Sequence, residues 1–170
     1  MHATASKEMV IVVSPTNRFK KIAPREEVRK QNLWHRGAFI LVFNSKGEVM
    51  VNQRSHSKDV YAGLWEIGPA GTVSAGESVR RTAVRELAEE IGVNVRLKPL
   101  FVFRFEDNHT REVGTVYIAI SDGPFKFKDG EVIASKFYAP EELNSEIANN
   151  PERFTPDSVF MWKKYLGQAK

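Results

Sequence analysis

The fold is decided by the stretch Gly71-Thr-Val-Ser-Ala-Gly-Glu77-Ser-Val-Arg-Arg-Thr-Ala-Val-Arg85-Glu86-Leu87-Ala-Glu89-Glu90-Ile-Gly92-Val93. A glycine-containing turn leads into a predicted helix over about residues 78–91. Glu86, Glu89 and Glu90 lie three and four residues apart near its C-terminus, where like charges repel one another and the helix dipole favours cations. Because a divalent cation would turn this repulsion into attraction, the spacing indicates a metal site.

The apolar residues of this segment have helical periodicity, and Gly92 follows at the position where a left-handed C-cap is expected. The predicted apolar stripe consists of Val79, Ala83, Leu87 and Ile91, widened by Val84 and Ala88. On a helical wheel the glutamates lie beside this stripe. A solvated, glutamate-rich helix face would explain Glu-x-x-Glu-Glu alone, but not its register with the glycines and with Arg85.

Composition predicts one soluble globular domain, since the chain has 170 residues, 42% hydrophobic and 27% charged. The absence of cysteine excludes disulfides and thiolate chemistry. The longest apolar run, residues 38–43, is too short for a membrane span, and no signal peptide is evident, so we expect a cytoplasmic protein with no membrane partner. The net charge of +4 fits either a basic surface or anionic partners.

Hydrophobic periodicity and turn residues predict an α+β fold or a layered α/β/α sandwich. The expected strands cover residues 9–13, 18–22, 38–43, 48–54, 95–105, 112–120 and 131–138. Further helices are expected over residues 25–31, from Pro140, and from about 155 to 167. Residues 55–76 are expected to form one long loop, and loops of that length are more often functional than idle.

The pattern Gly-x5-Glu-x7-Arg-Glu-Leu-x-Glu-Glu-x-Gly-Val over residues 71–93 resembles the Nudix box at every defining position. The resemblance implies a Nudix-type α/β/α sandwich with a mixed sheet. It also implies hydrolysis of a diphosphate linkage in a nucleoside-diphosphate-X type substrate, with Mg²⁺ or Mn²⁺ as cofactor. Residues 1–170 would form a single Nudix hydrolase domain with a core over about 36–140, an N-terminal extension over 9–34 and C-terminal helices over 140–167.

The same resemblance assigns roles within the box. Glu86, Glu89 and Glu90 are the expected metal ligands, with Glu89 and Glu90 bound directly and Glu86 either a ligand or a proton acceptor. Arg85, Glu86 and Glu89 are the expected catalytic residues. Arg85 lies four residues before Glu89 and can hold that carboxylate in place, and Glu77 is expected to be structural, paired with Arg85.

Three residues outside the helix are candidates for substrate binding. Gly71 permits close backbone approach to metal or phosphate. Arg54 fits bidentate phosphate binding and equally a surface salt bridge. Glu131 begins a strand in a region where many Nudix proteins have a base or metal carboxylate, although a solvated turn explains it as well.

Other polar and aromatic residues are expected to be structural. The aromatic residues at strand positions are expected in the core rather than stacked on a base, namely Trp65, Phe103, Phe105 and Tyr117. His109 and Glu112 are expected at the surface beside a hairpin, and His35 and Arg36 could serve either role.

A narrower resemblance points to isopentenyl-diphosphate isomerase, a Nudix-fold enzyme. It is carried by His35-Arg36, Phe39–Phe43, Asn44-Ser-Lys-Gly47, Gln53-Arg54 and Gly63-Leu64-Trp65. Phe154-Thr-Pro-Asp-Ser158 and Glu106-Asp107 resemble the bacterial YfcD-type hydrolases of that subgroup. The isomerase needs a cysteine after the tryptophan, and this chain has none, so isomerase chemistry through that acid is excluded.

The loop before the box departs from ordinary Nudix hydrolases, which usually have Pro-Gly-Gly where this chain has Gly68-Pro69-Ala70-Gly71. The best-supported function from sequence is a Mg²⁺-dependent diphosphatase with a small-molecule diphosphate substrate. The alternatives are a non-catalytic nucleotide-binding regulator on the same fold and an RNA-end diphosphatase, although no basic-aromatic motif supports nucleic acid. A homodimer is conceivable, because the N-terminal hairpin and terminal helices lie outside the minimal fold.

Overall fold

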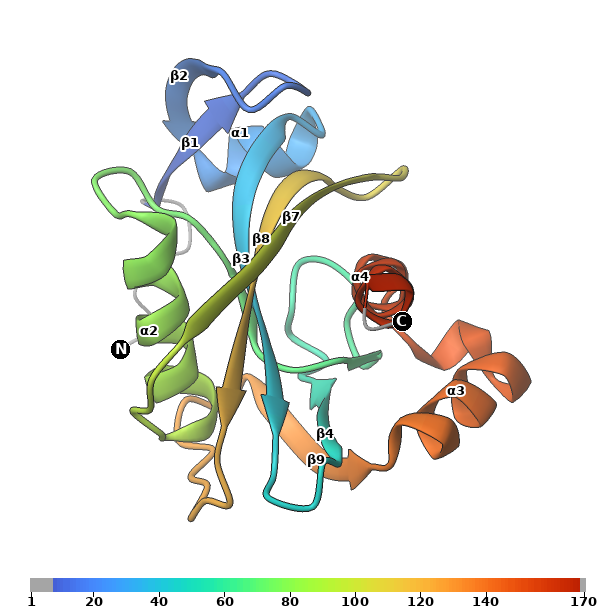
Figure 1. The fold of residues 1–170 in the computed structure, drawn as a ribbon. Coiled ribbons are helices and arrows are strands. Elements are labelled where there is room, and N and C mark those ends of the chain that lie inside the picture. The colour runs from blue at the N-terminus through green and yellow to red at the C-terminus, as the bar shows by residue number, and fades with distance from the viewer. Residues whose placement is uncertain (1–7, 169–170) are drawn as a thin grey trace.

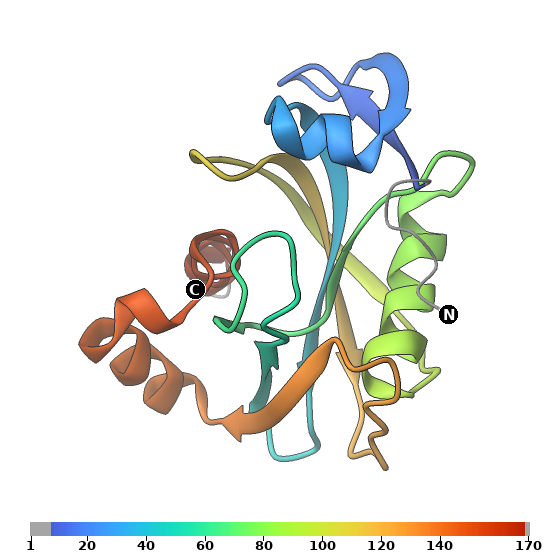
Figure 2. The ribbon, with the colours of Figure 1, turned by 180° about the vertical axis from the view of Figure 1, so that it is seen from behind.

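The computed structural model describes residues 8–168 as a mixed β-sheet with helices on both faces. Helix α2 (Val79–Ile91) covers one face, and helices α3 (Pro140–Asn149) and α4 (Pro156–Gln168) lie on the other side (Figures 1 and 2). The predicted α+β fold is therefore confirmed. The structure also contains helix α1 (Arg25–Lys30) and a short 3-10 helix, η2 (Pro151–Arg153).

The strands are β1 (Met9–Val13), β2 (Phe19–Pro24), β3 (Trp34–Phe43), β4 (Val49–Arg54), β5 (Trp65–Glu66), β6 (Ala70–Thr72), β7 (Lys98–Glu106), β8 (Arg111–Ile120) and β9 (Val132–Tyr138). The prediction of one unbroken loop over residues 55–76 is wrong, because β5 pairs with β4 and β6 pairs with β3. The third and seventh strands begin at Trp34 and Lys98 rather than at residues 38 and 95.

Strand β3 is the centre of the sheet. It runs parallel to β8 along its whole length, from Trp34 opposite Arg111 to Phe43 opposite Ile120. Its pairings with β1, β4 and β6 are antiparallel, as are those of β7 with β8 and of β9 with β4. This arrangement brings β6, which leads into α2, beside the strand on which both layers of the core are built.

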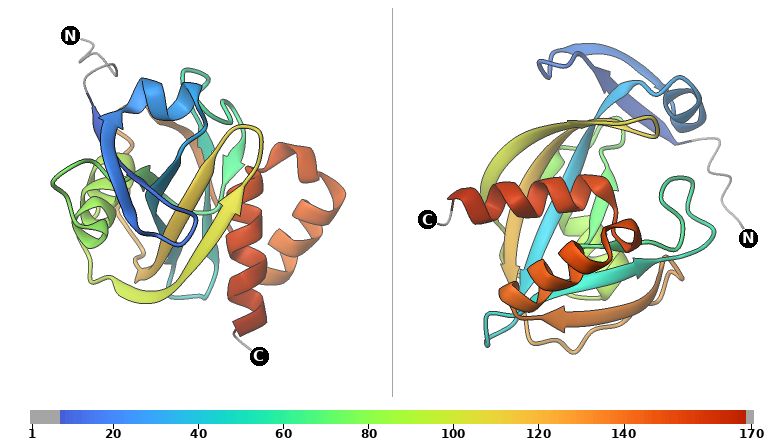
Figure 3. Two further views of the ribbon diagram at one scale, coloured as in Figure 1. Left: turned by 90° about the horizontal axis from the view of Figure 1, so that it is seen from above. Right: turned by 90° about the vertical axis from the view of Figure 1, so that its right-hand side faces the viewer.

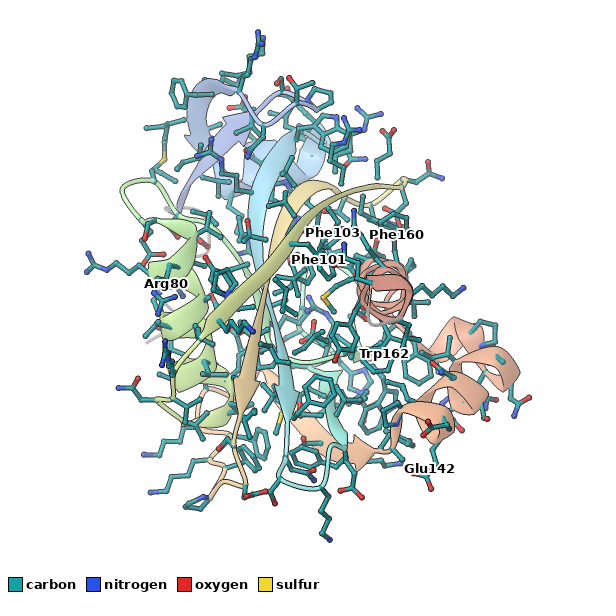
Figure 4. The ribbon with its side chains drawn as sticks, viewed as in Figure 1. Arg80, Phe101, Phe103, Glu142, Phe160 and Trp162 are labelled. Carbon is teal, nitrogen blue, oxygen red and sulfur yellow. The ribbon has the colours of Figure 1, made fainter. Side chains whose placement is uncertain are left out.

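Two hydrophobic cores lie on opposite faces of β3, because successive side chains of a strand point to opposite sides. Phe39 belongs to the core under α4, together with Phe103 and Trp162, whereas Ile40 packs with Leu87 under α2. The α4 layer is rich in aromatic contacts, and Phe103 lies 6.0 Å from Phe160 between ring centres. Figure 4 shows these rings gathered beside α4, with Arg80 on the opposite layer.

Helix α2 spans nearly the predicted range and ends at the predicted C-cap, Gly92. The Ser78 hydroxyl accepts from the Arg81 amide, and Gly92 is left-handed with φ of 72°. The predicted apolar stripe is too wide, however, since Val84 and Ala88 are exposed. Their places on the buried face are taken by polar residues, so that the buried face consists of Thr82, Ala83, Glu86, Leu87, Glu90 and Ile91.

The N-terminal hairpin β1–β2 and helix α1 lie at one end of the sheet, above β3 and β8 (Figure 1; Figure 3, left). Val12 pairs with His35 of β3, and a small apolar cluster of Val10, Val12, Ala23 and Val28 holds the hairpin to α1. Helices α4 and α3 lie in front of the sheet in Figure 3, right. Within residues 8–168, no helix combines the length and apolar character that a membrane span requires.

Candidate active site

A cavity of about 520 Å³ opens where the buried edge of α2 meets the strands. Its walls come from α1, the segment between β4 and β5, β6, α2, β8 and the first turn of α4. Glu86 and Glu90 reach this region because they lie one helical turn apart on the buried face of α2. The cavity therefore gathers side chains that are far apart in the sequence.

Three carboxylates in this region can share one cation. Glu86, Glu90 and Glu131 each offer an oxygen atom, and these oxygens all lie within 4.8 Å of one another. Burial raises the pKa of Glu86 to about 7, with Glu131 and Glu89 adding repulsion against the attraction of Arg85. Burial and repulsion by Glu66 and Glu86 raise the pKa of Glu90 well above its usual range.

Glu90 provides the test of whether these residues suit a metal ion. Its side chain is fully buried, yet neither carboxylate oxygen has a hydrogen-bond partner among the residues the structure describes. A buried carboxylate without hydrogen bonds costs several kcal/mol unless a cation neutralises it. Oxygen ligands from Glu86, Glu90 and Glu131 are the kind that Mg²⁺ and Mn²⁺ prefer, so the residues fit a hard divalent cation.

Arg85 connects three carboxylates of the helix and its preceding turn. Its Nε and Nη2 donate to the two oxygens of Glu77, each at 3.1 Å. Its Nη1 donates to Glu86 at 2.7 Å and to Glu89 at 3.1 Å. The Arg85 guanidinium lowers the pKa of Glu77. The structure thus places Glu89 half exposed on Arg85 and outside the shared group of Glu86, Glu90 and Glu131.

Gly71 lies in β6, directly against the Glu86 carboxylate. A Cβ atom at this position would lie 2.3 Å from Glu86 Cδ and Oε1, a distance that no methyl group can occupy. Gly68 is similarly constrained, because its φ is +81° and a Cβ would lie 1.9 Å from the Ile40 carbonyl oxygen. These glycines let the loop before α2 pack tightly between β3 and the carboxylates.

Comparison with known proteins agrees with this geometry. The NUDIX domain family model matches residues 33–158, which is most of the chain. An uncharacterized Nudix hydrolase of Pseudomonas aeruginosa, PA4841, is 36% identical over 165 residues, covering 96% of each chain. The chain belongs to the Nudix family. As a Nudix hydrolase it is an enzyme acting on acid anhydride bonds in phosphorus-containing compounds, and members of the family generally use a divalent metal.

The predicted subgroup is confirmed as well. The uncharacterized Nudix hydrolase YfcD of Escherichia coli K12 is 34% identical, with 94% of this chain and 89% of that protein covered. An isopentenyl-diphosphate Delta-isomerase of Serratia proteamaculans is 30% identical, with 87% and 86% covered.

Solved structures share the fold at low sequence identity. DR0079 from Deinococcus radiodurans has a TM-score of 0.79 at 23% identity, covering 92% of this chain and 98% of that one. The NUDIX domain of Shewanella oneidensis NrtR, complexed with ADP ribose, has a TM-score of 0.61 at 19% identity, covering 79% and 88%.

Arg54 lines the cavity of this Nudix hydrolase, and all three nitrogens of its guanidinium group donate hydrogen bonds within the protein. Its Nη1 donates to Glu66 at 2.7 Å, and its Nε and Nη2 donate to the Val60 carbonyl oxygen. The ion pair with Glu66 is largely buried rather than on the surface. Glu66 is a cavity residue that the sequence reasoning missed, because a two-residue strand gives no periodicity from which to infer its direction.

The prediction that Glu112 lies at the surface is wrong. Glu112 is buried at the cavity, and its Oε1 has no hydrogen-bond partner among the described residues. Burial raises the pKa of Glu112 well above its usual range. Asp157 raises this pKa further, through charge repulsion and through a hydrogen bond. Glu112 and Gly114 lie on the same face of β8 as the core residue Val116, because every second residue of a strand points to the same side. This pattern in the sequence indicates that the Glu112 carboxylate points inward.

The N-terminal extension supplies another wall of the cavity. Asp59 accepts hydrogen bonds from the Nε atoms of Arg25 and Arg29 of α1, each at 3.1 Å. Arg29 also reaches His35, whose Nδ1 donates to the Leu33 carbonyl oxygen. Burial, followed by repulsion from Arg29, lowers the pKa of His35 to about 4.

The predictions for the aromatic residues and for His109 are confirmed. Trp65, Phe103 and Tyr117 are in the core, as predicted, and Phe105 packs against it partly buried. His109 is exposed, also as predicted.

Proposed function

We propose that this Nudix hydrolase is Mg²⁺-dependent and cleaves the diphosphate linkage of a nucleoside-diphosphate-X type substrate. The observation that carries the proposal is Glu90, a fully buried carboxylate that accepts no hydrogen bond from the residues the structure describes, beside Glu86 and Glu131. Without a cation this arrangement is costly, and with one it becomes a binding site for a phosphate-bound metal.

The proposed roles follow from the contacts of each side chain. Glu86, Glu90 and Glu131 would hold the metal, which when bound neutralises diphosphate charge and lowers the pKa of water. Arg85 donates hydrogen bonds to the carboxylates of Glu86 and Glu89. In this proposal one of the two accepts the proton from the attacking water.

Cationic groups for the diphosphate are also present. Arg54 and Lys58 both line the cavity, and a guanidinium or ammonium can bind phosphate oxygens there. Gly71 keeps the Glu86 carboxylate close to β6, so that the metal-binding edge and the cation-lined wall face the same space.

A hydrolysis panel with Mg²⁺ tests the proposal. It should include nucleoside triphosphates, dinucleotides, nucleotide sugars, ADP-ribose, coenzyme A and isoprenoid diphosphates, with phosphate release as the measurement. We expect Glu90→Gln to lower turnover of the best substrate by at least about a hundredfold while circular dichroism stays unchanged. Unchanged phosphate release in the folded Glu90→Gln enzyme would refute the metal assignment.

A nucleotide-binding regulator is the principal alternative, since the NrtR domain with this fold was solved with ADP ribose. Ligand binding alone does not require the whole set of carboxylates around Arg85, which favours the enzyme. Binding of panel compounds with no release under Mg²⁺ would support the regulator. Faster cleavage of triphosphate-ended RNA than of free nucleotides would support an RNA-end diphosphatase.

We also propose that residues 1–170 form one Nudix domain in the cytoplasm, with a small-molecule partner. The continuous sheet from β2 to β5, with β1 paired to both β2 and β3, supports a single unit. A homodimer stays a prediction, which light scattering of the purified protein would test.

A further inference from the structure

Lys58 places its ammonium group at the carboxylates that are proposed to hold the metal. Its Nζ donates to Glu131 Oε2 and lies 3.9 Å from Glu90 Oε1. The Lys58 side chain is largely buried. Its ammonium group therefore lies in the protein interior beside two members of the group.

Two other carboxylates nearby have their own cations. Glu66 is paired with Arg54, and Glu86 is paired with Arg85. Among residues 8–168, the ion pairs of Glu90 and Glu131 are both with Lys58. A single ammonium is thus the ion-pair partner of the two members of this group that have no guanidinium partner, at the place where a divalent cation would bind.

Asp59, the residue after Lys58, binds the segment over residues 55–64 to helix α1 on the opposite wall of the cavity. Asp59 pairs with Arg25 and Arg29 of α1, while Lys58 pairs with Glu131 before β9. The backbone amide of Ser55 also donates to the Glu131 carbonyl oxygen at 2.8 Å. The segment over residues 55–64 consequently spans the cavity wall, and its fastening at Lys58 depends on carboxylates that a metal would take.

We propose that Lys58 is an internal counter-cation that a divalent metal must displace, so that metal binding releases the 55–64 segment from the carboxylate side of the cavity. This proposal rests on the proposed metal site. A divalent ion and the ammonium would compete for the carboxylates of Glu90 and Glu131, because two cations held this close together repel each other. Lys58 thereby sets the metal affinity of the free enzyme and couples it to the segment.

Calorimetric titration with Mn²⁺ alone tests the competition without any substrate. Lys58→Met removes the charge and keeps the length, Lys58→Arg keeps a cation, and Lys46→Met removes the same charge from an exposed turn. We expect Lys58→Met to bind Mn²⁺ about three- to tenfold more tightly than the wild type, with the other two variants close to wild type. Equal or weaker binding by folded Lys58→Met overturns the counter-cation role.

Hydrogen exchange of the wild-type enzyme, read by mass spectrometry, gives a test that depends on no variant. We expect Mn²⁺ to speed exchange within residues 55–64 while slowing it in α2. Exchange in the segment that is unchanged or slowed by Mn²⁺ overturns the release. If the wild type and Lys58→Met both fail to bind Mn²⁺, the metal site itself is refuted. If both bind it equally, the metal site stands and the Lys58 proposal alone fails.

Discussion

Arg85 and Glu77 are joined by two-pronged hydrogen bonding across eight residues, from Nε to Oε1 and from Nη2 to Oε2 at 3.1 Å each. The third nitrogen of the same guanidinium reaches Glu86 and Glu89. Glu77 therefore fixes the orientation of the group that orients two further carboxylates, although it lies in the turn before the helix.

Replacing Arg85 with Lys should weaken both stability and turnover, because an ammonium cannot serve Glu77 and Glu86 in a fork. We expect the free energy of unfolding in urea to fall by about 1–2 kcal/mol. We expect kcat to fall further than the loss of folded protein explains. Arg81→Lys, on the exposed side of α2, is the matched control. Equal kinetics for the Arg85→Lys and Arg81→Lys enzymes would argue against an orienting role.

Gly71→Ala should disturb Glu86 directly, since the added methyl group would lie 2.3 Å from its carboxylate carbon. The carboxylate or β6 must shift, and overpacking of this kind costs about 1–3 kcal/mol. Thermal unfolding and metal titration of the variant should both show the loss. Gly167→Ala, where nothing lies within 4 Å of the new atom, should leave both quantities unchanged. Wild-type metal affinity in Gly71→Ala would contradict the close-packing argument.

His35 should make the protein less stable in mild acid. Its folded pKa of about 4 lies below the ordinary value of 6.5, so the unfolded chain takes up the proton first. Its contribution to stability is therefore intact above about pH 6.5 and is lost as the pH falls towards 4, amounting to about 3 kcal/mol. Urea unfolding between pH 7.5 and 4 measures this slope. His35→Asn should flatten it, whereas His109→Asn, at an exposed site, should not.

Glu112 should have the opposite pH dependence. Its folded pKa is raised well above the ordinary 4.5, so its contribution is fully present below about pH 4.5 and is lost as the pH rises. Glu112→Gln should therefore match the wild type at pH 4 and exceed its unfolding free energy by about 1–2 kcal/mol at pH 8. Glu152→Gln, at an exposed position, should show no such divergence. Parallel curves for Glu112→Gln and wild type would show that Glu112 is ionised without penalty.

The part of the site that could be predicted lies within one helix. Ser78, Gly92 and the register of Glu86, Glu89 and Glu90 follow from local rules of capping and periodicity, and α2 forms as expected. The same rules misjudged Val84, because periodicity cannot tell which flank of an apolar stripe faces the core.

The cavity residues outside the helix depend on tertiary contacts. Lys58, Asp59 and Glu66 lie in a segment without regular periodicity, and their directions follow from pairing with β4 and from ion pairs to α1 and β9. Glu131 joins Glu86 and Glu90 only because β9 pairs with β4. No local pattern in the chain records such long-range pairings, whereas the inward direction of Glu112 was available from strand alternation.

The contact of α1 with Asp59 joins a segment outside the family model to the cavity wall. The family match begins at residue 33, so Arg25 and Arg29 come from a segment outside the matched region. Substitutions there could reshape the entrance to the cavity while leaving the carboxylates of α2 untouched. A protein engineer could therefore vary α1 and residues 55–64 as a library while the proposed metal-binding carboxylates of α2 stay constant.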